Sequence, residues 1–464
     1  MPTKNYKLIL ILSIFILLFS SVTIQAAEYS LEELIQTGFE KNIEIQQLKN
    51  ELTTIQRNIK LNRARSDWQA NLSLDKELIE DDSTVVNRNG NEEVSVSLNK
   101  NFAKDKFTVS PNAYYDFDGS EVIYGVNMNL DLYPGVPSES LQNLINLNNQ
   151  LNQKQKELFN KQAELAKSWI KQYLDLLRLD ENIKVLEERL ALAQDDYQEV
   201  QDQVEINEAG QQDLLQAEID LNDAKFNLKQ SRQNFKRLKS QLLSELQINK
   251  NNQIILSENN DIINRLQDLT EDLNIDELDK DKMVENVVKT SSQFARIINN
   301  KEYLKKELEW LKKDDAPQVS LQGSYDSESD FTASVNVSYN IFDSGVQEMT
   351  VENKKQEIEN SELSLTQLYQ QTENNIENLI DQVELAQLEK ENSQLKYDKA
   401  VRDTEIIQQQ IEAGAVEADV LKSNQLNEQN VLISLKQNED DVFLNKLDLL
   451  TLTRPDDIVE EVTK

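Results

Sequence analysis

The chain has 464 residues, and 83 Asp and Glu against 49 Lys and Arg give it a formal net charge of −34. This excess of negative charge repels phosphate groups and argues against a nucleic-acid partner. The sequence has no histidine and no cysteine, which excludes Cys/His zinc sites, thiol and Ser-His nucleophiles, haem ligation by either residue, and disulfides. None of its nine glycines precedes a lysine in a phosphate-binding loop. We therefore expect no enzyme and no cofactor.

The first 26 residues have the order of a secretory signal peptide. Lys4 and Lys7 precede the apolar run 8–19, and small residues then lead to Ala26 and Ala27. A membrane anchor is the alternative, but this run is shorter than the roughly 20 apolar residues that span a bilayer. We expect export, with cleavage after Ala26 or Ala27. No later segment is apolar enough for a transmembrane helix, so a membrane location would require a β-barrel.

Two long stretches, residues 138–209 and 346–413, contain neither glycine nor proline, the strongest breakers of helices. Each stretch can run as one helix roughly 100 Å long, at 1.5 Å per residue. A single glycine follows each of them, Gly210 and Gly414, and a second helical pattern follows each glycine. Each half of the chain is therefore predicted to form an antiparallel helical hairpin with the glycine at its tip.

The apolar residues of these helices recur at alternating steps of three and four. A repeat of 3.5 residues keeps one seam of a helix facing a partner helix, which predicts a coiled coil. Polar residues interrupt the seam in the second half. The first half carries it at Leu176, Leu179, Ile183, Leu186 and Leu190, and again at Leu214, Ala217, Leu221, Ala224 and Leu228.

Strand patterns precede each long helix. Residues 122–133 and 331–341 alternate apolar and polar side chains over eleven or twelve positions. The usual strand has about five or six residues, whereas a tilted strand needs roughly 9–11 to cross a bilayer. A soluble, half-buried sheet gives the same alternation and is the alternative; predicted export and the attached helices favour the membrane. Further strand candidates are 69–79, 93–102, 106–117 and 318–326, and the acidic segment 80–92 is a predicted exposed loop.

The two halves repeat the same order of helix, strands and long helix. Residues 42–74 parallel 292–321, and 126–135 parallel 335–345. Whether residues 249–290 pack beside the helices or act as a linker is open. The predicted division is a signal peptide (1–26), a first repeat (27–248), an inter-repeat segment (249–276), a second repeat (277–453) and a C-terminal tail (454–464).

Three short motifs stand in the same order as in a known family: Tyr29-Ser30-Leu31-Glu32-Glu33-Leu34, Ile341-Phe342-Asp343-Ser344-Gly345, and Gly414 followed by Asp419-Val420-Leu421. By these motifs and the duplicated order, the chain from about residue 28 to 453 resembles the TolC-like outer-membrane efflux protein family. The resemblance implies a mainly α fold with β, in which duplicated long antiparallel coiled-coil hairpins are joined to strands. In the family these strands contribute to a trimeric transmembrane β-barrel of 12 strands above a periplasmic tunnel.

The resemblance implies a homotrimeric duct in the outer membrane, with a long periplasmic portion and outer-membrane lipid around its barrel. Such a duct belongs to a tripartite efflux pump or a type I secretion system and passes small molecules or proteins passively. Its implied partners are a periplasmic adaptor, or membrane fusion protein, and an inner-membrane transporter. The alternative is an exported periplasmic coiled-coil scaffold or adaptor with a soluble β-domain. Two copies of strands of bilayer length favour the duct.

One spacing departs from the family. Leu72 and Pro134 are 62 positions apart, whereas Val319 and Asp343 are 24 apart. The first half therefore has room for four strands where the family uses two. The extra hairpin is either an addition outside the membrane or part of a larger barrel.

The candidate pore residues lie just after the tip glycines, Gly210 and Gly414. Asp213 and Asp419 begin the returning helices, and the simple interpretation of each is capping of a helix N-terminus. The resemblance instead implies two rings of aspartates at a constriction. Asp419 matches the first of them, but Lys422 stands where the second would be.

Overall fold

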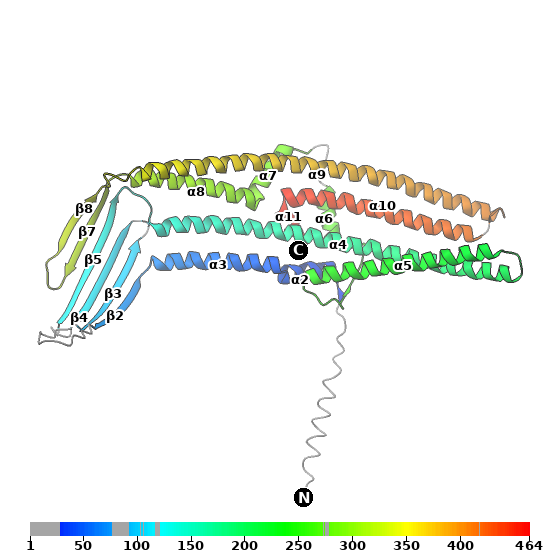
Figure 1. Cartoon of the computed structure of the whole chain (residues 1–464), viewed down its shortest axis with the longest axis horizontal. Coiled ribbons are helices and arrows are strands. Elements are labelled where there is room, and N and C mark those ends of the chain that lie inside the picture. Colours follow the sequence, from blue (N-terminus) through cyan, green and yellow to red (C-terminus); the bar gives the residue numbers. More distant parts are fainter. Residues whose placement is uncertain are drawn as a thin grey trace, which may run out of the picture.

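The computed structural model describes residues 28–76, 92–102, 104, 106–116, 121–271, 273, 278–416 and 418–464. The predicted signal peptide lies outside these residues, as does the predicted loop 80–92 except for Glu92, which belongs to a strand. The molecule is elongated, with a β-sheet at one end and helices extending from it to the other (Figure 1). In the described part of the chain, we find no helix with the length and apolar character to cross a membrane.

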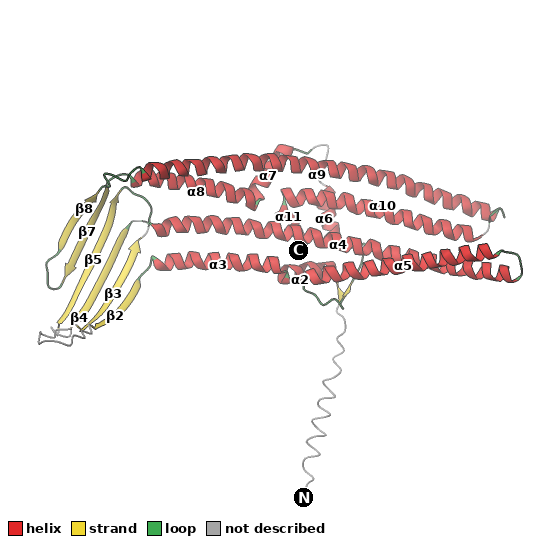
Figure 2. Ribbon diagram, in the orientation of Figure 1, coloured by secondary structure: helices red, strands yellow, loops and turns green. Residues whose placement is uncertain are grey.

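Two hairpins of long helices run along the molecule, as the sequence predicts (Figure 2). The partners in each hairpin contact each other extensively. The long helix of each hairpin has 67 residues, which corresponds to roughly 100 Å. The first hairpin pairs α4 (Glu139–Glu205) with α5 (Gln211–Glu245), and the second pairs α9 (Val346–Glu412) with α10 (Ala418–Thr453).

Two shorter helices, α3 (Ile43–Arg65) and α8 (Ser292–Asp314), accompany the long helices toward the sheet. Each begins with a polar cap, Asn42 or Ser291, whose side chain accepts hydrogen bonds from two following amides. Helix α3 contacts α4, α4 contacts α8, and α8 contacts α9. The four helices therefore lie side by side in the order α3, α4, α8, α9 (Figure 1).

The main core lies in the middle of the molecule and joins both halves. Small elements surround it: α2 (Leu31–Lys41), α6 (Asp261–Glu271), α7 (Lys280–Thr290), α11 (Pro455–Thr463), and the parallel pair β1 (Glu28–Tyr29) and β6 (Gln253–Ile254). The chain after residue 248 thus packs against the helices through α6 and α7, which contact α10. Members of the core include Leu34, Trp169, Leu246, Ile262, Phe294, Ile376, Leu447 and Ile458.

In the described part of the chain, the sheet contains six antiparallel strands in the order β2, β3, β4, β5, β7, β8. All six strand candidates are confirmed as strands, and positions 77–79 and 117 of two candidates lie outside the described residues. The first half supplies four of these strands and the second half two. The last strand is shorter than predicted and ends at Ser338, because its partner Gln318 is the first residue of β7. The strands are β2 (Gln69–Lys76), β3 (Glu92–Phe102), β4 (Phe107–Asp116), β5 (Glu121–Tyr133), β7 (Gln318–Asp326) and β8 (Thr332–Ser338).

Candidate functional site: a two-faced sheet and the tips of the helical hairpins

One face of the sheet is apolar from edge to edge. The register pairs apolar residues with apolar residues across successive strands, as in Leu72 with Val96 and Val96 with Ala113. Many of these side chains are exposed, and Leu72 is 74% exposed. The face includes Ala70 and Leu74 on β2, Val94 and Leu98 on β3, Val109 and Pro111 on β4, Val122, Val126 and Leu130 on β5, Val319 and Leu321 on β7, and Val335 and Val337 on β8. So broad an apolar surface requires an apolar cover.

The opposite face carries hydroxyl and amide side chains along the middle of every strand. Their hydroxyl groups bond across strands, with 2.6 Å between Ser73 and Ser95 and 2.6 Å between Ser324 and Thr332. A cavity of about 270 Å³ opens among polar residues of β4, β5, β7 and β8. The face includes Asn71, Ser97, Asn99, Thr108, Ser110, Asn112, Asn127, Asn129, Ser320, Gln322, Ser334 and Asn336. Such a surface suits contact with water rather than lipid.

Aromatic residues gather near both ends of the strands. Eight residues separate Phe107 from Tyr115, or roughly 26 Å along β4. With the tilt of about 35–45° that strands have in membrane barrels, this would be about 20 Å of height, comparable with the apolar band of about 25 Å between their aromatic girdles. The helix-side group comprises Trp68, Phe102, Phe107, Tyr133 and Tyr339, and the far group comprises Tyr115, Tyr124, Tyr325 and Phe331.

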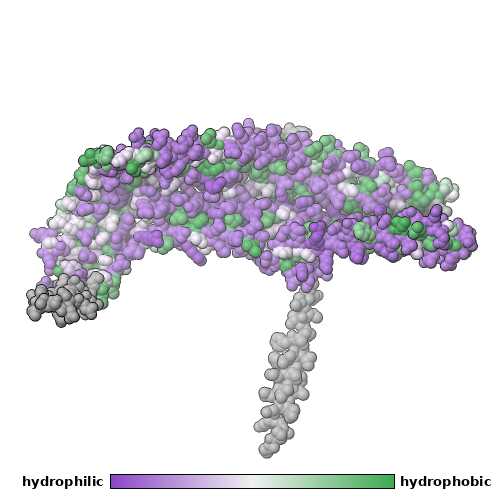
Figure 3. Space-filling view, in the orientation of Figure 1, coloured by the Kyte–Doolittle hydropathy of each residue, from purple (hydrophilic) through white to green (hydrophobic). Residues whose placement is uncertain are grey.

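A lysine is held within the helix-side aromatic group. The Lys100 ammonium lies 5.5 Å from the centroid of the Trp68 ring and 5.1 Å from that of Phe102. It also lies 3.1 Å from a carboxylate oxygen of Asp67, just before β2. A cation among aromatic rings is a typical anchor at a boundary between an apolar layer and water. Figure 3 shows hydrophobic residues gathered where the sheet joins the helices, whereas the visible side of the helices is mostly hydrophilic.

At the first tip, Asp213 acts as a helix cap. Its carboxylate accepts a hydrogen bond of 2.8 Å from the backbone N–H of Gly210, which satisfies an amide group ahead of α5. Gly210 has a φ of −96°, a conformation open to other residues, whereas Gly414 at the second tip has a φ of +71°. The glycine at the second tip is thus required by its left-handed backbone.

At the second tip, Asp419 lies in the first turn of α10, and its side chain is outside the described part. Lys422 lies three residues further along, and its ammonium is 2.6 Å from a carboxylate oxygen of Glu188 on α4. The structure therefore brings Lys422 to the first hairpin but does not bring it to Asp213. Both members of this pair are nearly half exposed, so the link between the hairpins is weak.

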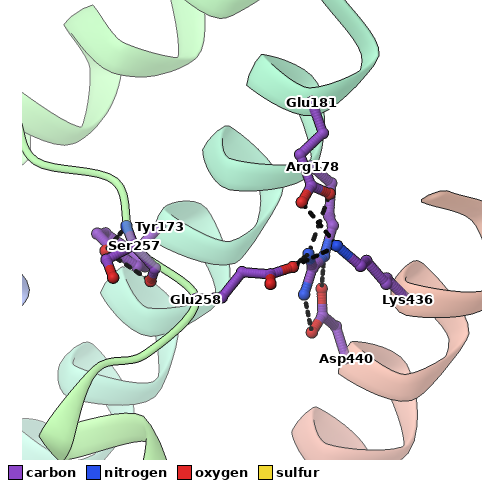
Figure 4. A network of polar contacts seen from close by, with 7 residues as sticks. All are labelled: Tyr173, Arg178, Glu181, Ser257, Glu258, Lys436 and Asp440. Atoms are coloured by element: carbon purple, nitrogen blue, oxygen red, sulfur yellow. Dashed lines mark hydrogen bonds and ion pairs between the residues drawn. The ribbon is translucent and has the colours of Figure 1, made fainter. Parts of the chain in front are cut away.

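A stronger ionic network connects the hairpins further from the tips (Figure 4). The Arg178 guanidinium on α4 donates two hydrogen bonds, of 2.7 and 3.1 Å, to the Asp440 carboxylate on α10. It also donates to Glu181 on the same helix at 3.1 Å and to Glu258, just before α6, at 3.0 Å. Lys436 on α10 donates to both of these glutamates. The network thus joins the first repeat, the inter-repeat segment and the second repeat.

Burial and pairing shift the pKa values of this network in opposite directions. Hydrogen bonds, first from Lys436 and then from Arg178, lower the pKa of Glu258 to about 2. Burial raises the pKa of the Asp440 carboxyl, and the hydrogen bonds from Arg178 only partly oppose this. The Asp440 side chain is only 14% exposed, so its charge depends on the arginine.

Sequence analysis did not find this network. Arg178 and Asp440 lie 262 positions apart, and neither belongs to a recognisable motif. The only local signal is that Arg178 is a charged residue between Leu177 and Leu179. Sequence analysis also gave no role to Tyr173. Its hydroxyl accepts a 2.9 Å hydrogen bond from the N–H of Ser257 and fixes the inter-repeat segment to α4 (Figure 4).

Solved structures with a similar arrangement of sheet and helices include outer-membrane proteins. No protein-family model and no curated protein matches this sequence. The chain is similar to the outer membrane protein VceC of Vibrio cholerae, with 12% identity over 91% of this chain and 96% of that one, and a TM-score of 0.59. The chain has the TolC-like fold.

Two further TolC-like structures support this assignment. The CmeC outer membrane channel of Campylobacter jejuni matches with 12% identity, over 93% of this chain and 89% of that one, at a TM-score of 0.61. The MtrE outer membrane channel of Neisseria gonorrhoeae, in its open state, matches with 11% identity, over 91% and 88%, at a TM-score of 0.56. These matches each cover 91% or more of this chain, so the TolC-like fold that the sequence motifs imply is confirmed.

Proposed function

We propose that this chain is the outer-membrane duct of a tripartite efflux pump or a type I secretion system. The observation that carries the proposal is the sheet, which is apolar on one face, polar on the other and attached at one end to helices of roughly 100 Å. Lipid would cover the apolar face, and the polar face would line a water-filled lumen. The duct needs no covalent chemistry, so the proposal is of a passive channel rather than an enzyme.

The tilt of the strands supports a barrel wall. Rows of paired residues cross the sheet obliquely. The row that passes one position before Gln69, the first residue of β2, ends at Ala333, the second residue of β8. Gln69 and Ser338, at the opposite end of β8, both lie on the helix side. Each strand is therefore shifted along its neighbour by about 1.2 residues, or about 4 Å. Since neighbouring strands are about 4.8 Å apart, this shift corresponds to a tilt of about 40° from the barrel axis. Membrane barrels have tilts of about 35–45°.

The proposed assembly is a homotrimer. One sheet of six strands has two free edges, β2 and β8, and is smaller than a closed barrel of at least about eight strands. The helices would form a periplasmic tunnel below the barrel. Its tips at Gly210 and Gly414 would meet a periplasmic adaptor and, through it, an inner-membrane transporter. Asp419 and Lys422 would line the constriction at the tips, with Asp213 supporting the first hairpin.

The proposal also keeps the division of the chain predicted from sequence. Residues 1–26 would direct export, and 27–248 and 277–453 would be tandem helix-strand-helix repeats. The segment 249–276 would link them, with its α6 packed against α10 and α11, and 454–464 would form a tail that carries α11. This places the chain in the outer membrane with a long periplasmic portion.

Two neighbouring substitutions test the proposal because their side chains point to opposite faces of β8. Val335→Arg places a charge on the lipid face, which costs about 2–4 kcal/mol per chain near the membrane centre and should strongly reduce insertion. Asn336→Arg places the same charge in the lumen and should insert normally while shifting the conductance toward anions. Insertion is measured as the protein that remains in the outer-membrane fraction after a high-salt wash, and selectivity as the reversal potential in a planar bilayer.

The alternative function, an exported periplasmic scaffold or adaptor, predicts a different pattern. High salt would then release the parent protein from membranes. The two substitutions would also have similar effects on fractionation, because neither face would contact lipid. That result would refute the duct.

A further inference from the structure

The extra hairpin of the first half, β3 and β4, lies in the middle of the sheet. Strand β3 pairs with β2 along the whole of β2, from Gln69 to Lys76, and β4 pairs with β5 from Phe107 to Asp116. If this hairpin stood outside a barrel wall, both of these ladders would have to break. Strands β2 and β5 would then have to form a new ladder with each other to keep their backbone groups paired in the apolar layer. The pairing therefore favours a place within the wall.

The faces of the hairpin agree with those of its neighbours. Val96 on β3 pairs with Leu72 on β2 and with Ala113 on β4, and Ala113 pairs in turn with Tyr124 on β5. Between them on the other face, Ser97 pairs with Asn71 and Asn112. A hairpin that projects into water has no reason to continue the apolar face of the membrane strands, since both of its faces would be wetted.

The width of the six-stranded sheet matches that of the helices that join it. Helices α3, α4, α8 and α9 lie side by side, and at about 8–10 Å per helix they span about 32–40 Å. A strand tilted by about 40° occupies about 6.3 Å of wall, so six strands span about 38 Å whereas four span only about 25 Å. A wall with all six strands therefore continues from the helices without narrowing.

The two free edges fit a second copy of this chain. An even number of antiparallel strands makes β2 and β8 run in opposite directions. When β8 of one copy joins β2 of the next head to tail, the new pair is antiparallel, all apolar faces point outward, and all helices leave from the same end. Pairing of two β2 edges about a two-fold axis would instead send the helices of the two copies in opposite directions.

From these observations the geometry points to a wall that includes β3 and β4, so that three copies of the chain close an 18-stranded barrel. This inference rests on the proposed trimeric duct and specifies its membrane interface. Barrel diameter grows with strand number, so 18 strands give a backbone diameter of about 36 Å, against about 24 Å for 12. The membrane part of this duct would be about one and a half times as wide as a barrel built from four strands per chain.

Single-cysteine labelling tests the inference, because the natural sequence contains no cysteine. The four variants are Asn71→Cys and Leu72→Cys on β2, and Ser97→Cys and Val96→Cys on β3. Each full-length variant is reconstituted into lipid vesicles and treated with a charged, water-soluble maleimide. We expect the polar-face cysteines at 71 and 97 to react at least about tenfold faster than the apolar-face cysteines at 72 and 96, which lipid would cover.

Comparing β2 with β3 distinguishes failure of this inference from failure of the proposed function. If 71 and 72 differ but 96 and 97 react equally fast, the hairpin lies outside the wall and the inference is overturned, while the duct remains. If neither pair differs, the sheet does not border lipid and the proposed function itself fails. Native mass spectrometry of the same particles counts the chains, and any number other than three overturns the 18-stranded barrel.

Discussion

We expect the ionic contact between Arg178 and Asp440 to contribute measurably to the stability of the contact between the two hairpins. Arg178→Met keeps much of the aliphatic volume but removes both hydrogen bonds to the Asp440 carboxylate. The two side chains are only 11% and 14% exposed, so the remaining carboxylate would be a buried charge without its partner. Such a change costs about 3–5 kcal/mol. Glu181 and Glu258 keep Lys436 as a partner, which favours the lower end of this range, about 3 kcal/mol.

Hydrogen exchange measured by mass spectrometry reports this loss locally. Exchange in residues 436–444 should accelerate about a hundredfold, because each factor of ten corresponds to about 1.4 kcal/mol. The double variant Arg178→Met with Asp440→Leu should recover most of the protection, since an apolar pair needs no counter-charge. Lys171→Met is the matched control on α4. Its partner Asp175 lies one turn away, and both side chains are about half exposed. Lys171 also opposes the rise in the pKa of Asp441 on α10, but it makes no buried ion pair there, so exchange should change by less than about threefold.

The effect of Arg178→Met should also depend on pH. The folded pKa of Asp440 is already above its ordinary value because of burial, and loss of the arginine raises it further. A carboxyl with a raised pKa destabilises the folded state when it is ionised and does so less as the pH falls through its folded pKa. The single variant should therefore lose less protection at pH 4 than at pH 7. Equal exchange in the variant and the Lys171→Met control at pH 7 would refute the reasoning.

Three further predictions concern the tip, the core and the acid limb of stability. Lys422→Asp should increase cation preference in a planar bilayer, because it replaces an ammonium near the proposed constriction with a carboxylate; an unchanged reversal potential in working channels would place it elsewhere. Gly38→Ala should cost about 1–3 kcal/mol in thermal unfolding, because its Cβ would overlap the Trp169 ring. Gly210→Ala should cost less than about 1 kcal/mol, because its Cβ would meet a carboxylate oxygen of Asp213 at 3.4 Å, an ordinary van der Waals contact. Glu258→Gln should lower the free energy of unfolding at pH 7. The low pKa of Glu258 means that its ionised carboxylate stabilises the folded state above about pH 4.5, and this contribution disappears as the pH falls through about 2. The variant should therefore lose less stability than the parent between pH 4.5 and 2.

Sequence reasoning predicted the helices and strands because their signals are local and repeated. The absence of glycine and proline over more than sixty positions predicted α4 and α9, and their apolar seams predicted the hairpins. Alternation of apolar and polar residues predicted β5 and β8, and the other four strands were named as further candidates. The end of β8 was wrong by three residues, because alternation continues to Ile341 while the partner strand does not. A single sequence cannot show where a neighbouring strand ends.

The contacts between the repeats could not be predicted in the same way. Neither Arg178 nor Asp440 carries a local signal of its partner, and spacing along the chain does not report which helix faces are opposed. The same limitation applies to Lys422. The family pattern drew attention to its charge, but its contact with Glu188 depends on how the two hairpins lie together. The position of the extra hairpin within the sheet likewise required the strand order, which the spacing left open between two alternatives.

Stability is distributed unevenly along the molecule, and this bears on how the proposed duct would change its opening. The large core draws on both repeats and on the inter-repeat segment, and the buried Arg178 and Asp440 pair lies beside it. Toward the tips, the second buried cluster of the described residues is small and consists of Val185, Leu426 and Ile433. Beyond that cluster, the exposed pair of Lys422 and Glu188 joins the hairpins. Separating the tips therefore breaks weak, solvated contacts, whereas separating the middle would expose the core and a buried charge. Movement at the tips is accordingly compatible with a fixed middle and an intact sheet.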